Sequence, residues 1–256
     1  AKAESLVHLS SRDYVIDIGA NDGTLLRGYT KKPHLVGFEP ARNLMKYARK
    51  GTTKIINDFF SFAAWEKAFG FAKAKVITAI AMFYDLEDPN SFVADVAKCL
   101  HGDGIFIIQM SYLPSMLTQN AFDNICHEHL EYYSLLSLEH LLSRHHLEVF
   151  DVELNDVNGG SFRIYIRHKN GGKSIQVPRG AAKRVRDLRE YEESLRLDEQ
   201  KVYDDFVKRV HKLRSQLTAF IKKEVAQGKK VYVYGASTKG NTLLQFYNLN
   251  YKLIKA

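Results

Sequence analysis

The stretch VIDIGANDGTLL, residues 15–26, decides the fold of this chain. An apolar strand ends around Asp17, and Gly19 and Gly23 follow before a helix-like segment. Glycines in such a turn let the backbone and its amides approach a ligand where no side chain would fit. The spacing D-x-G-x-x-x-G is neither the G-x-G-x-x-G of dinucleotide folds nor the G-x-x-x-x-G-K-S/T of P-loops. The stretch predicts a strand, turn and helix with a nucleotide-type pocket; the alternative is a turn that closes an ordinary α/β domain without a ligand.

Short apolar runs recur along the chain and alternate with helix-like stretches. The runs that predict parallel strands are 13–19, 34–39, 53–57, 74–82 and 104–110. Continuous apolar strands separated by helices indicate a parallel sheet that is covered on both faces. Two further runs, 147–155 and 161–168, flank the turn sequence DVNGG and predict an antiparallel hairpin that closes the sheet. The fold class is therefore α/β.

The pattern of apolar residues changes after this predicted sheet. Apolar residues recur every three to five positions between 180 and 227, which predicts a shorter helix followed by one long amphipathic helix. Basic residues dominate the outer face without interleaved aromatic residues, so we expect a solvated surface and no nucleic-acid partner. A strand, a glycine loop and a helix are predicted again from residue 229. We expect a first domain over 1–170, a helical connecting segment over 171–228 and, over 229–256, the incomplete beginning of a second α/β domain.

Composition narrows the class of protein. The 256 residues are 45% hydrophobic, enough for a sizeable core, and the net charge of +8 suits nucleic acid, an anionic surface or an anionic small molecule. Cys99 and Cys126 are too few for a disulfide framework or a cysteine-rich zinc module. No apolar run approaches the roughly 20 residues of a membrane span. These features predict a cytoplasmic protein without a membrane partner.

The spacing of Asp17, Gly19 and Gly23 resembles the first motif of class I S-adenosylmethionine (SAM) methyltransferases, whose sheet is Rossmann-like. Glu39, at the end of the second predicted strand, can accept hydrogen bonds from both ribose hydroxyls of such a ligand. Asp58 follows the third strand, where these enzymes commonly have an acid that faces the adenine. The resemblance implies SAM as cofactor, and the residues that we predict to bind it are Asp17, Gly19, Asn21, Gly23, Glu39, Asp58 and Met82.

A narrower resemblance is carried by five segments. In chain order they are DIGANDGTLL, FYDLEDPNSF, HEHLEYYSL, NGGSFRIYI and YGASTKGNTLL. They look like the sugar C-methyltransferases that act on nucleotide-linked 4-keto deoxysugars, and the likeness touches nearly the whole chain. That family usually has an N-terminal cysteine-rich zinc-binding domain and a complete C-terminal Rossmann-like domain. This sequence lacks the first and contains only the start of the second, so we expect a piece of a longer protein.

The segment NICHEHLEYYSL, residues 124–135, contains two closely spaced histidines. Their spacing is not the H-E-x-x-H of a helical zinc site, so we expect no metal here. A polar loop with solvated histidines is one interpretation, but ligands collect beyond the carboxyl ends of parallel strands, and this segment follows the fifth strand. By resemblance, His129 is the general base and Glu128 the acid beside it, although a structural salt bridge would equally explain Glu128. Candidate donors for the oxygen of an enolate are Tyr84, Tyr132 and Tyr133.

Other residues are predicted to bind the substrate. The helix that starts in GASTKGNT, with Lys239 and Asn241, could hold a diphosphate, although a tight turn between strand and helix would give the same pattern. Lys239 precedes Gly240, whereas the lysine of a P-loop follows its glycine, so we reject an ATPase. Tyr133 and Ser161 complete the predicted substrate contacts; hairpin formation alone would also explain Ser161.

We therefore expect a SAM-dependent C-methyltransferase that methylates the carbon next to the ketone of a nucleotide-linked 4-keto deoxysugar. His129 would remove a proton from that carbon, because an imidazole is suited to accept a proton near neutral pH. The carbon nucleophile would then take the methyl group and leave S-adenosyl-L-homocysteine (SAH). Two alternatives stay open: O- or N-methylation of another small molecule or of RNA, and a non-catalytic module that binds SAM.

Overall fold

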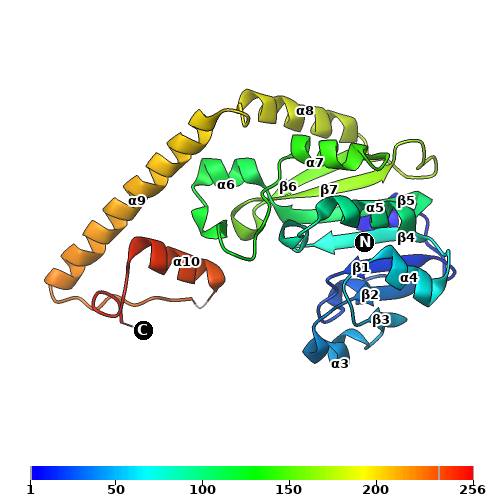
Figure 1. Ribbon diagram of the computed structural model, residues 1–256, viewed down its shortest axis with the longest axis horizontal. Coiled ribbons are helices and arrows are strands. Elements are labelled where there is room, and N and C mark those ends of the chain that lie inside the picture. Colours follow the sequence, from blue (N-terminus) through cyan, green and yellow to red (C-terminus); the bar gives the residue numbers. More distant parts are fainter. Residues whose placement is uncertain (1, 236, 256) are drawn as a thin grey trace.

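Residues 2–235 and 237–255 are described by the computed structural model, and their strands form one seven-stranded sheet (Figure 1). The strands are β1 (Tyr14–Ile18), β2 (His34–Phe38), β3 (Lys54–Ile56), β4 (Ala74–Ile80), β5 (Leu100–Ser111), β6 (Leu147–Asn155) and β7 (Ser161–His168). Their order is β3-β2-β1-β4-β5-β7-β6, and β7 runs antiparallel to both of its neighbours while the other pairs are parallel. The predicted α/β class, with a parallel sheet and a closing hairpin, is confirmed.

One edge of the sheet collects the segments that can carry function. The parallel strands β1, β2, β4 and β5 all end there, as the direction of their pairing requires. Because β7 runs the other way, it begins at the same edge, where its first residue Ser161 pairs with Ser111, the last residue of β5. Ligands of open α/β sheets bind beyond the carboxyl ends of the parallel strands, so this edge is where a site is expected.

Helices cover both faces of the sheet, as the sequence predicted. The helices on one face are α4 (Phe62–Phe69), α5 (Pro89–Cys99), α7 (Leu135–Ser143) and α8 (Ala181–Ser194). Those on the other face are α1 (Lys2–Leu6), α2 (Thr24–Arg27) and α3 (Met45–Ala48). The interior strand β1 is consequently apolar on both sides, and its neighbouring residues Val15 and Ile16 are both fully buried. Short 3₁₀ helices lie in the connections, namely η1 (Arg42–Leu44), η2 (Phe83–Asp85), η3 (Phe122–Asn124) and η4 (Val157–Gly159).

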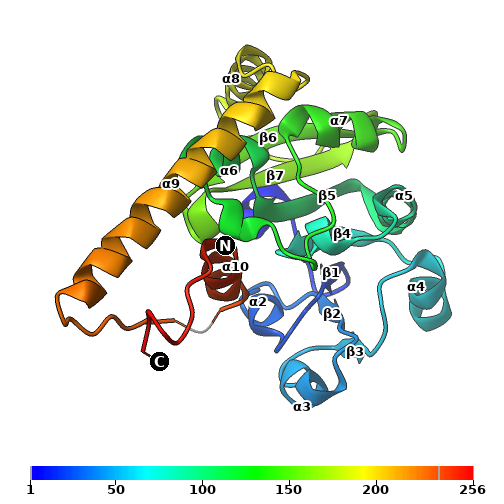
Figure 2. The same cartoon turned by 60° about the vertical axis from the view of Figure 1, so that its left-hand side comes forward.

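A separate apolar cluster joins α6 (Leu113–Gln119), η3, α9 (Gln200–Ala226) and α10 (Thr238–Tyr247). Figure 2 shows α9 as a long helix that passes α6 and α10. The predicted long amphipathic helix is confirmed, but its apolar stripe is covered only in part. Phe206 is buried in the cluster, whereas Leu213, Leu217 and Phe220 are 38%, 40% and 59% exposed. Within the described residues, no helix combines the length and the apolarity of a membrane span.

The predicted strand after residue 229 is wrong, while the helix after it is confirmed as α10. In its place the chain forms one isolated parallel bridge, between Tyr232 and Lys255, with α10 between the two partners. A strand becomes regular only when a neighbour pairs with its backbone N–H and C=O groups over several residues. Here one residue pairs, and the side chains of Tyr232 and Tyr234 lie exposed.

Candidate functional site

The glycine turn after β1 has the backbone that the sequence predicted. Gly19, Asn21 and Gly23 have φ of 70°, 49° and 81°, in the region that favours glycine. A Cβ on Gly23 would lie 2.9 Å from the backbone oxygen of Ala48, so a side chain could not be added without moving α3. The Gly19 amide donates to the carbonyl of Phe38 at 3.0 Å, which fastens the turn to β2.

Glu39, directly after β2, holds the same turn through its carboxylate. Its Oε2 accepts a hydrogen bond from the amide of Asn21 at 2.8 Å, and its Oε1 accepts one from the amide of Ala41 at 2.8 Å. The side chain is buried. A carboxylate can accept about four hydrogen bonds, so capacity remains for two hydroxyl donors. The carboxylate is thus fixed at the turn in a way that suits a ribose.

Asp17 lies beneath the turn and is also buried. Its Oδ1 accepts a hydrogen bond from the hydroxyl of Thr78 on β4 at 2.6 Å. Burial raises the pKa of Asp17 to about 7; the hydrogen bond from Thr78 opposes this rise, and the negative charge of Glu39 adds to it. Asp17 therefore changes its charge near neutral pH.

A cavity of about 670 Å³ opens beside the turn. This volume falls within the range of small-molecule and cofactor pockets. The predicted residues that line it are Asp17, Gly19, Asn21 and Met82. Gly23 and Glu39 support the turn instead, and Asp58 is exposed after β3, where its Oδ1 accepts a hydrogen bond from the amide of Phe59 at 2.8 Å. The bare glycine backbone, the buried acid and the cavity together fit an adenosyl amino acid such as SAM.

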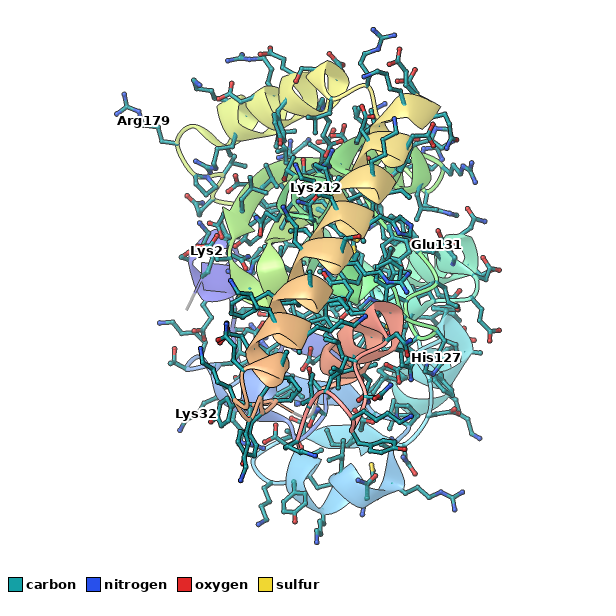
Figure 3. The ribbon with its side chains drawn as sticks, turned by 90° about the vertical axis from the view of Figure 1, so that its left-hand side faces the viewer. Lys2, Lys32, His127, Glu131, Arg179 and Lys212 are labelled. Atoms are coloured by element: carbon teal, nitrogen blue, oxygen red, sulfur yellow. The ribbon has the colours of Figure 1, made fainter. Side chains whose placement is uncertain are left out.

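The predicted base, His129, lies in the loop between η3 and α7. Its ring and the ring of Tyr84 are 4.3 Å apart between centroids, at a tilt of 51°. The carbonyl of Tyr84 also accepts hydrogen bonds from the amides of Leu130 and Glu131, at 2.9 and 3.1 Å. The imidazole is half-buried, while His127 and Glu131 lie on the outer surface (Figure 3). The segment after β4 and the histidine loop are thus held together at the ligand edge.

Asp85 is a carboxylate beside this pair that the sequence analysis missed. Partial burial raises the pKa of Asp85, the charge of His129 lowers it, and the charge of Glu128 raises it. The charges of His129 and Glu128 therefore both reach Asp85, although Glu128 itself is exposed. Its position in FYDLEDPNSF, next to Tyr84, was the available sequence signal.

The tyrosines of the site have different surroundings. Tyr84 and Tyr132 line a small cavity together with His129. Partial burial raises the pKa of Tyr84 to about 12, with smaller effects of Asp85 and Cys126, and burial also raises the pKa of Tyr132. Tyr133 instead points into the main core, where its ring meets Phe83 at 5.2 Å and its hydroxyl is buried without a partner among the described residues. Tyr84 and Tyr132 are the two that the fold brings to His129.

The remaining predicted substrate residues lie at two other places. The hydroxyl of Ser161 donates to the carbonyl of Val157 at 2.7 Å, inside the hairpin connection. Lys239 and Asn241 lie in the first turn of α10, and neither lines the cavities at the glycine turn or at His129. Asn241 is exposed. Their predicted contact with a diphosphate remains a prediction.

Residues that the sequence analysis did not select also line the large cavity. Among them are Gln109 of β5 and Arg163 and Tyr165 of β7. The alternation in SFRIYIRH was the available signal, since Ser161, Arg163 and Tyr165 share one face of a strand.

Two family models match the chain. One, described as "Methyltransferase domain", matches residues 3–152, and the other, described as "C-methyltransferase C-terminal domain", matches residues 156–256. The C-methyltransferase NovU of Streptomyces niveus is 32% identical over 251 residues, which are 97% of this chain and 58% of that protein. The chain therefore spans less than two thirds of the length of this relative.

Solved structures share the fold. A chain from the complex of the Haloferax volcanii Trm112 methyltransferase activator with a methyltransferase superposes with a TM-score of 0.52 and 15% sequence identity. The match covers 65% of this chain and 86% of that chain. At this identity the likeness concerns the fold alone.

Proposed function

Because the chain belongs to the class I SAM-dependent methyltransferases, the family whose domain model matches residues 3–152, we propose that it transfers a methyl group from SAM to a carbon atom. The match of residues 156–256 to the C-terminal domain of C-methyltransferases supports carbon as the acceptor. The glycine turn, Glu39 and the adjacent cavity provide the place for the donor.

One observation carries the proposal. Met82 lines the cavity at the glycine turn, and a Cβ on Gly19 would lie 3.4 Å from its Cγ. Tyr84, two residues later, packs against the ring of His129. Two residues span at most about 7 Å of chain, so the donor cavity and the imidazole lie within reach of one small substrate.

The acceptor that we propose is the carbon next to the ketone of a nucleotide-linked 4-keto deoxysugar. His129 removes a proton from this carbon and keeps it on the imidazole, which leaves an enolate. Tyr84 stays protonated, because its pKa is raised to about 12, and can donate a hydrogen bond to the enolate oxygen. When bound, SAM supplies a methyl group on a sulfonium, the electrophile that a carbon nucleophile requires.

The nucleotide part would lie toward α10. The ring of Phe246 on α10 packs against Phe122 of η3 at 5.0 Å, so α10 adjoins the segment that leads into the histidine loop. Lys239 and Asn241, in the first turn of α10, offer a cation and an amide for a diphosphate. The net charge of +8 suits such an anionic substrate.

The test is proton exchange at the sugar. The protein is incubated with a dTDP-4-keto-6-deoxysugar in deuterated water, and exchange at the carbon next to the ketone is followed by NMR. We expect His129→Asn to slow exchange and methyl transfer by at least about 100-fold, the usual contribution of a general base, while SAH binds as before. His127→Asn, an exposed neighbour in the same loop, is the matched control and should behave like the parent.

Exchange that is unaffected by His129→Asn would refute the role of the base. A methyl group found on oxygen or nitrogen of the product would refute carbon as the acceptor.

A further inference from the structure

The large cavity has a second wall that the proposed function leaves unused. It is formed by Gln109 of β5, Arg163 and Tyr165 of β7, and Lys2 of α1. The Nε of Arg163 donates to the Oε1 of Gln109 at 2.7 Å. An arginine therefore stands in the same cavity as the glycine turn, oriented by a side chain from the neighbouring strand.

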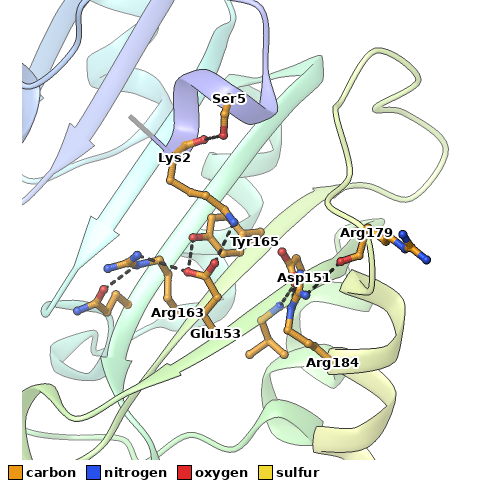
Figure 4. Close-up of polar contacts among 10 residues, drawn as sticks. Lys2, Ser5, Asp151, Glu153, Arg163, Tyr165, Arg179 and Arg184 are labelled. Carbon is orange, nitrogen blue, oxygen red and sulfur yellow. Dashed lines mark hydrogen bonds and ion pairs between the residues drawn. The ribbon is translucent and has the colours of Figure 1, made fainter.

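This wall carries an excess of positive charge (Figure 4). Glu153 is shared between two cations: Lys2 lies 2.9 Å from its Oε1, and Arg163 lies 3.5 Å from its Oε2. The hydroxyl of Tyr165 also donates to Glu153, at 2.8 Å. One carboxylate facing two cations leaves a net charge of one positive unit at this wall, which favours an anion beside it.

The opposite end of the cavity carries an acid. Strand register sets Asp17 beside Thr78, and two residues further along β4 Ile80 lies beside Gln109, which in turn pairs with Arg163. The polar side chains thus cross four adjacent strands, a width of about 14 Å, which the long arginine side chain shortens. An acid at one end and an arginine at the other are the partners that a zwitterion requires.

We propose that Arg163 and Gln109 bind the carboxylate of the amino-acid end of the donor, with Asp17 facing its ammonium group. The proposal rests on the proposed function, since it concerns how the same donor is held. A guanidinium is well suited to this task, because its fork of N–H donors matches the geometry of a carboxylate. Arg163 is then a binding residue that favours a donor whose amino-acid end still carries its carboxylate.

The test uses calorimetric titration with two ligands. One is SAH; the other is its decarboxylated analogue, which keeps the ammonium group and lacks the carboxylate. We expect Arg163→Gln to raise the dissociation constant of SAH about tenfold, as the loss of hydrogen bonds to a charged group predicts, and to leave that of the analogue unchanged. The parent should itself bind the analogue more weakly than SAH.

The matched control is Arg167→Gln. Arg167 lies four residues further along β7 and pairs with Glu148 at 2.9 Å, an equivalent contact across the hairpin that lies outside the cavity lining. This variant should bind both ligands like the parent. Gln109→Leu should repeat the selective loss in weaker form.

The outcomes separate the two proposals. If the parent binds neither ligand, the proposed donor site itself fails. If SAH binds and Arg163→Gln weakens both ligands equally or neither of them, the carboxylate subsite is refuted. A titration with dTDP completes the test: a loss of dTDP affinity in Arg163→Gln with SAH unchanged would assign the arginine to the phosphates of the acceptor and also overturn the subsite.

Discussion

The rings of Tyr84 and His129 lie 4.3 Å apart, although one residue follows β4 and the other precedes α7. The contact joins the segment that borders the donor cavity to the loop that carries the proposed base. Two hydrogen bonds to the carbonyl of Tyr84 hold the same loop, so the backbone contact and the ring contact can be separated by substitution.

Substitution of Tyr84 should separate its ring from its hydroxyl. Tyr84→Phe keeps the ring against His129 and should lower kcat only by the loss of one hydrogen bond to the enolate. Tyr84→Ala also removes the ring contact, worth about 0.5–1.5 kcal/mol, and should lower kcat up to about tenfold further. Steady-state kinetics measure both effects, and titration with SAH is the control. Equal rates for the two variants would show that the ring does not position His129.

Glu39 should contribute to affinity through the ribose. Glu39→Gln keeps one acceptor oxygen but turns an NH₂ group toward a backbone amide donor, so SAH should bind about 10- to 100-fold more weakly. The 2′-deoxy analogue of SAH is the matched ligand. The parent should bind it poorly, and Glu39→Gln should weaken it less than it weakens SAH. If the substitution weakens both ligands to the same extent, Glu39 only supports the turn.

Asp17 should make donor binding dependent on pH. Its pKa is about 7 in the free protein, and an ammonium group requires the ionised carboxylate, so a proton must leave when SAH binds below this pH. Affinity should therefore fall by up to tenfold per pH unit as pH decreases below 7, and calorimetry in buffers of different ionisation enthalpy should detect the released proton. Asp17→Asn should bind weakly at every pH, without this slope. A slope that persists in Asp17→Asn would assign the proton to another group.

The raised pKa of Asp17 should make the folded protein less stable as pH rises. A salt-bridged acid, whose pKa is lowered, has the opposite effect. The folded protein holds the proton of Asp17 more tightly than the unfolded chain, whose carboxyl has a pKa near its ordinary value of 3.8. The unfolding free energy should therefore decrease, by a few kcal/mol, as pH rises from about 4 to about 7. Urea unfolding across this range measures the change, and Asp17→Asn should lose this part of the dependence.

Glu192 of α8 should stabilise the start of α7. Its carboxylate is buried and accepts hydrogen bonds from the hydroxyl of Tyr112 at 2.8 Å and from the first two amides of α7 at 2.6 and 2.9 Å. Glu192→Gln turns a donor toward one of these donors and should lower the unfolding free energy by about 2–3 kcal/mol, whereas Tyr112→Phe should lower it by about 1 kcal/mol. The control Arg189→Gln breaks the more exposed ion pair with Glu139 between the same two helices and should cost less than about 1 kcal/mol. A larger loss in Arg189→Gln than in Glu192→Gln would contradict this assignment.

Gly23 should tolerate no side chain. Gly23→Ala meets both a left-handed φ of 81° and the backbone oxygen of Ala48 at 2.9 Å. Gly228 has nearly the same φ, 79°, with no atom near its added Cβ. Gly228→Ala should therefore lower the unfolding free energy only by the cost of the left-handed backbone, about 1–2 kcal/mol. Thermal unfolding should show a larger loss of stability for Gly23→Ala than for Gly228→Ala, and Gly23→Ala should also bind SAH more weakly. Equal losses would mean that α3 moves aside without cost.

Local sequence patterns were sufficient for the sheet and for the glycine turn. Strand runs and the residues after them are encoded within a few positions, which is why Gly19, Gly23 and Glu39 could be placed at the turn after β1 and at the end of β2. Arg163 could not be predicted as a site residue in this way, because its place in the cavity depends on which strand β7 pairs with. Pairing between distant strands has no local signature beyond alternation.

Two other features could not be predicted from the sequence, for related physical reasons. The apolar run after residue 229 has strand composition, but a strand needs partners that the run itself does not specify. The relation between α10 and the histidine loop depends on the packing of Phe246 against Phe122, residues far apart in the chain. The roles of Lys239 and Asn241 accordingly stay predictions.

The reversed direction of β7 determines which side chains could be exchanged at the site. In a fully parallel sheet, each strand reaches this edge with its last residues, and a loop follows. Here the first residues of β7 arrive at the same rim from a strand anchored on both sides by β5 and β6. Side chains on such a rigid element can be exchanged to alter ligand preference while the glycine turn stays intact.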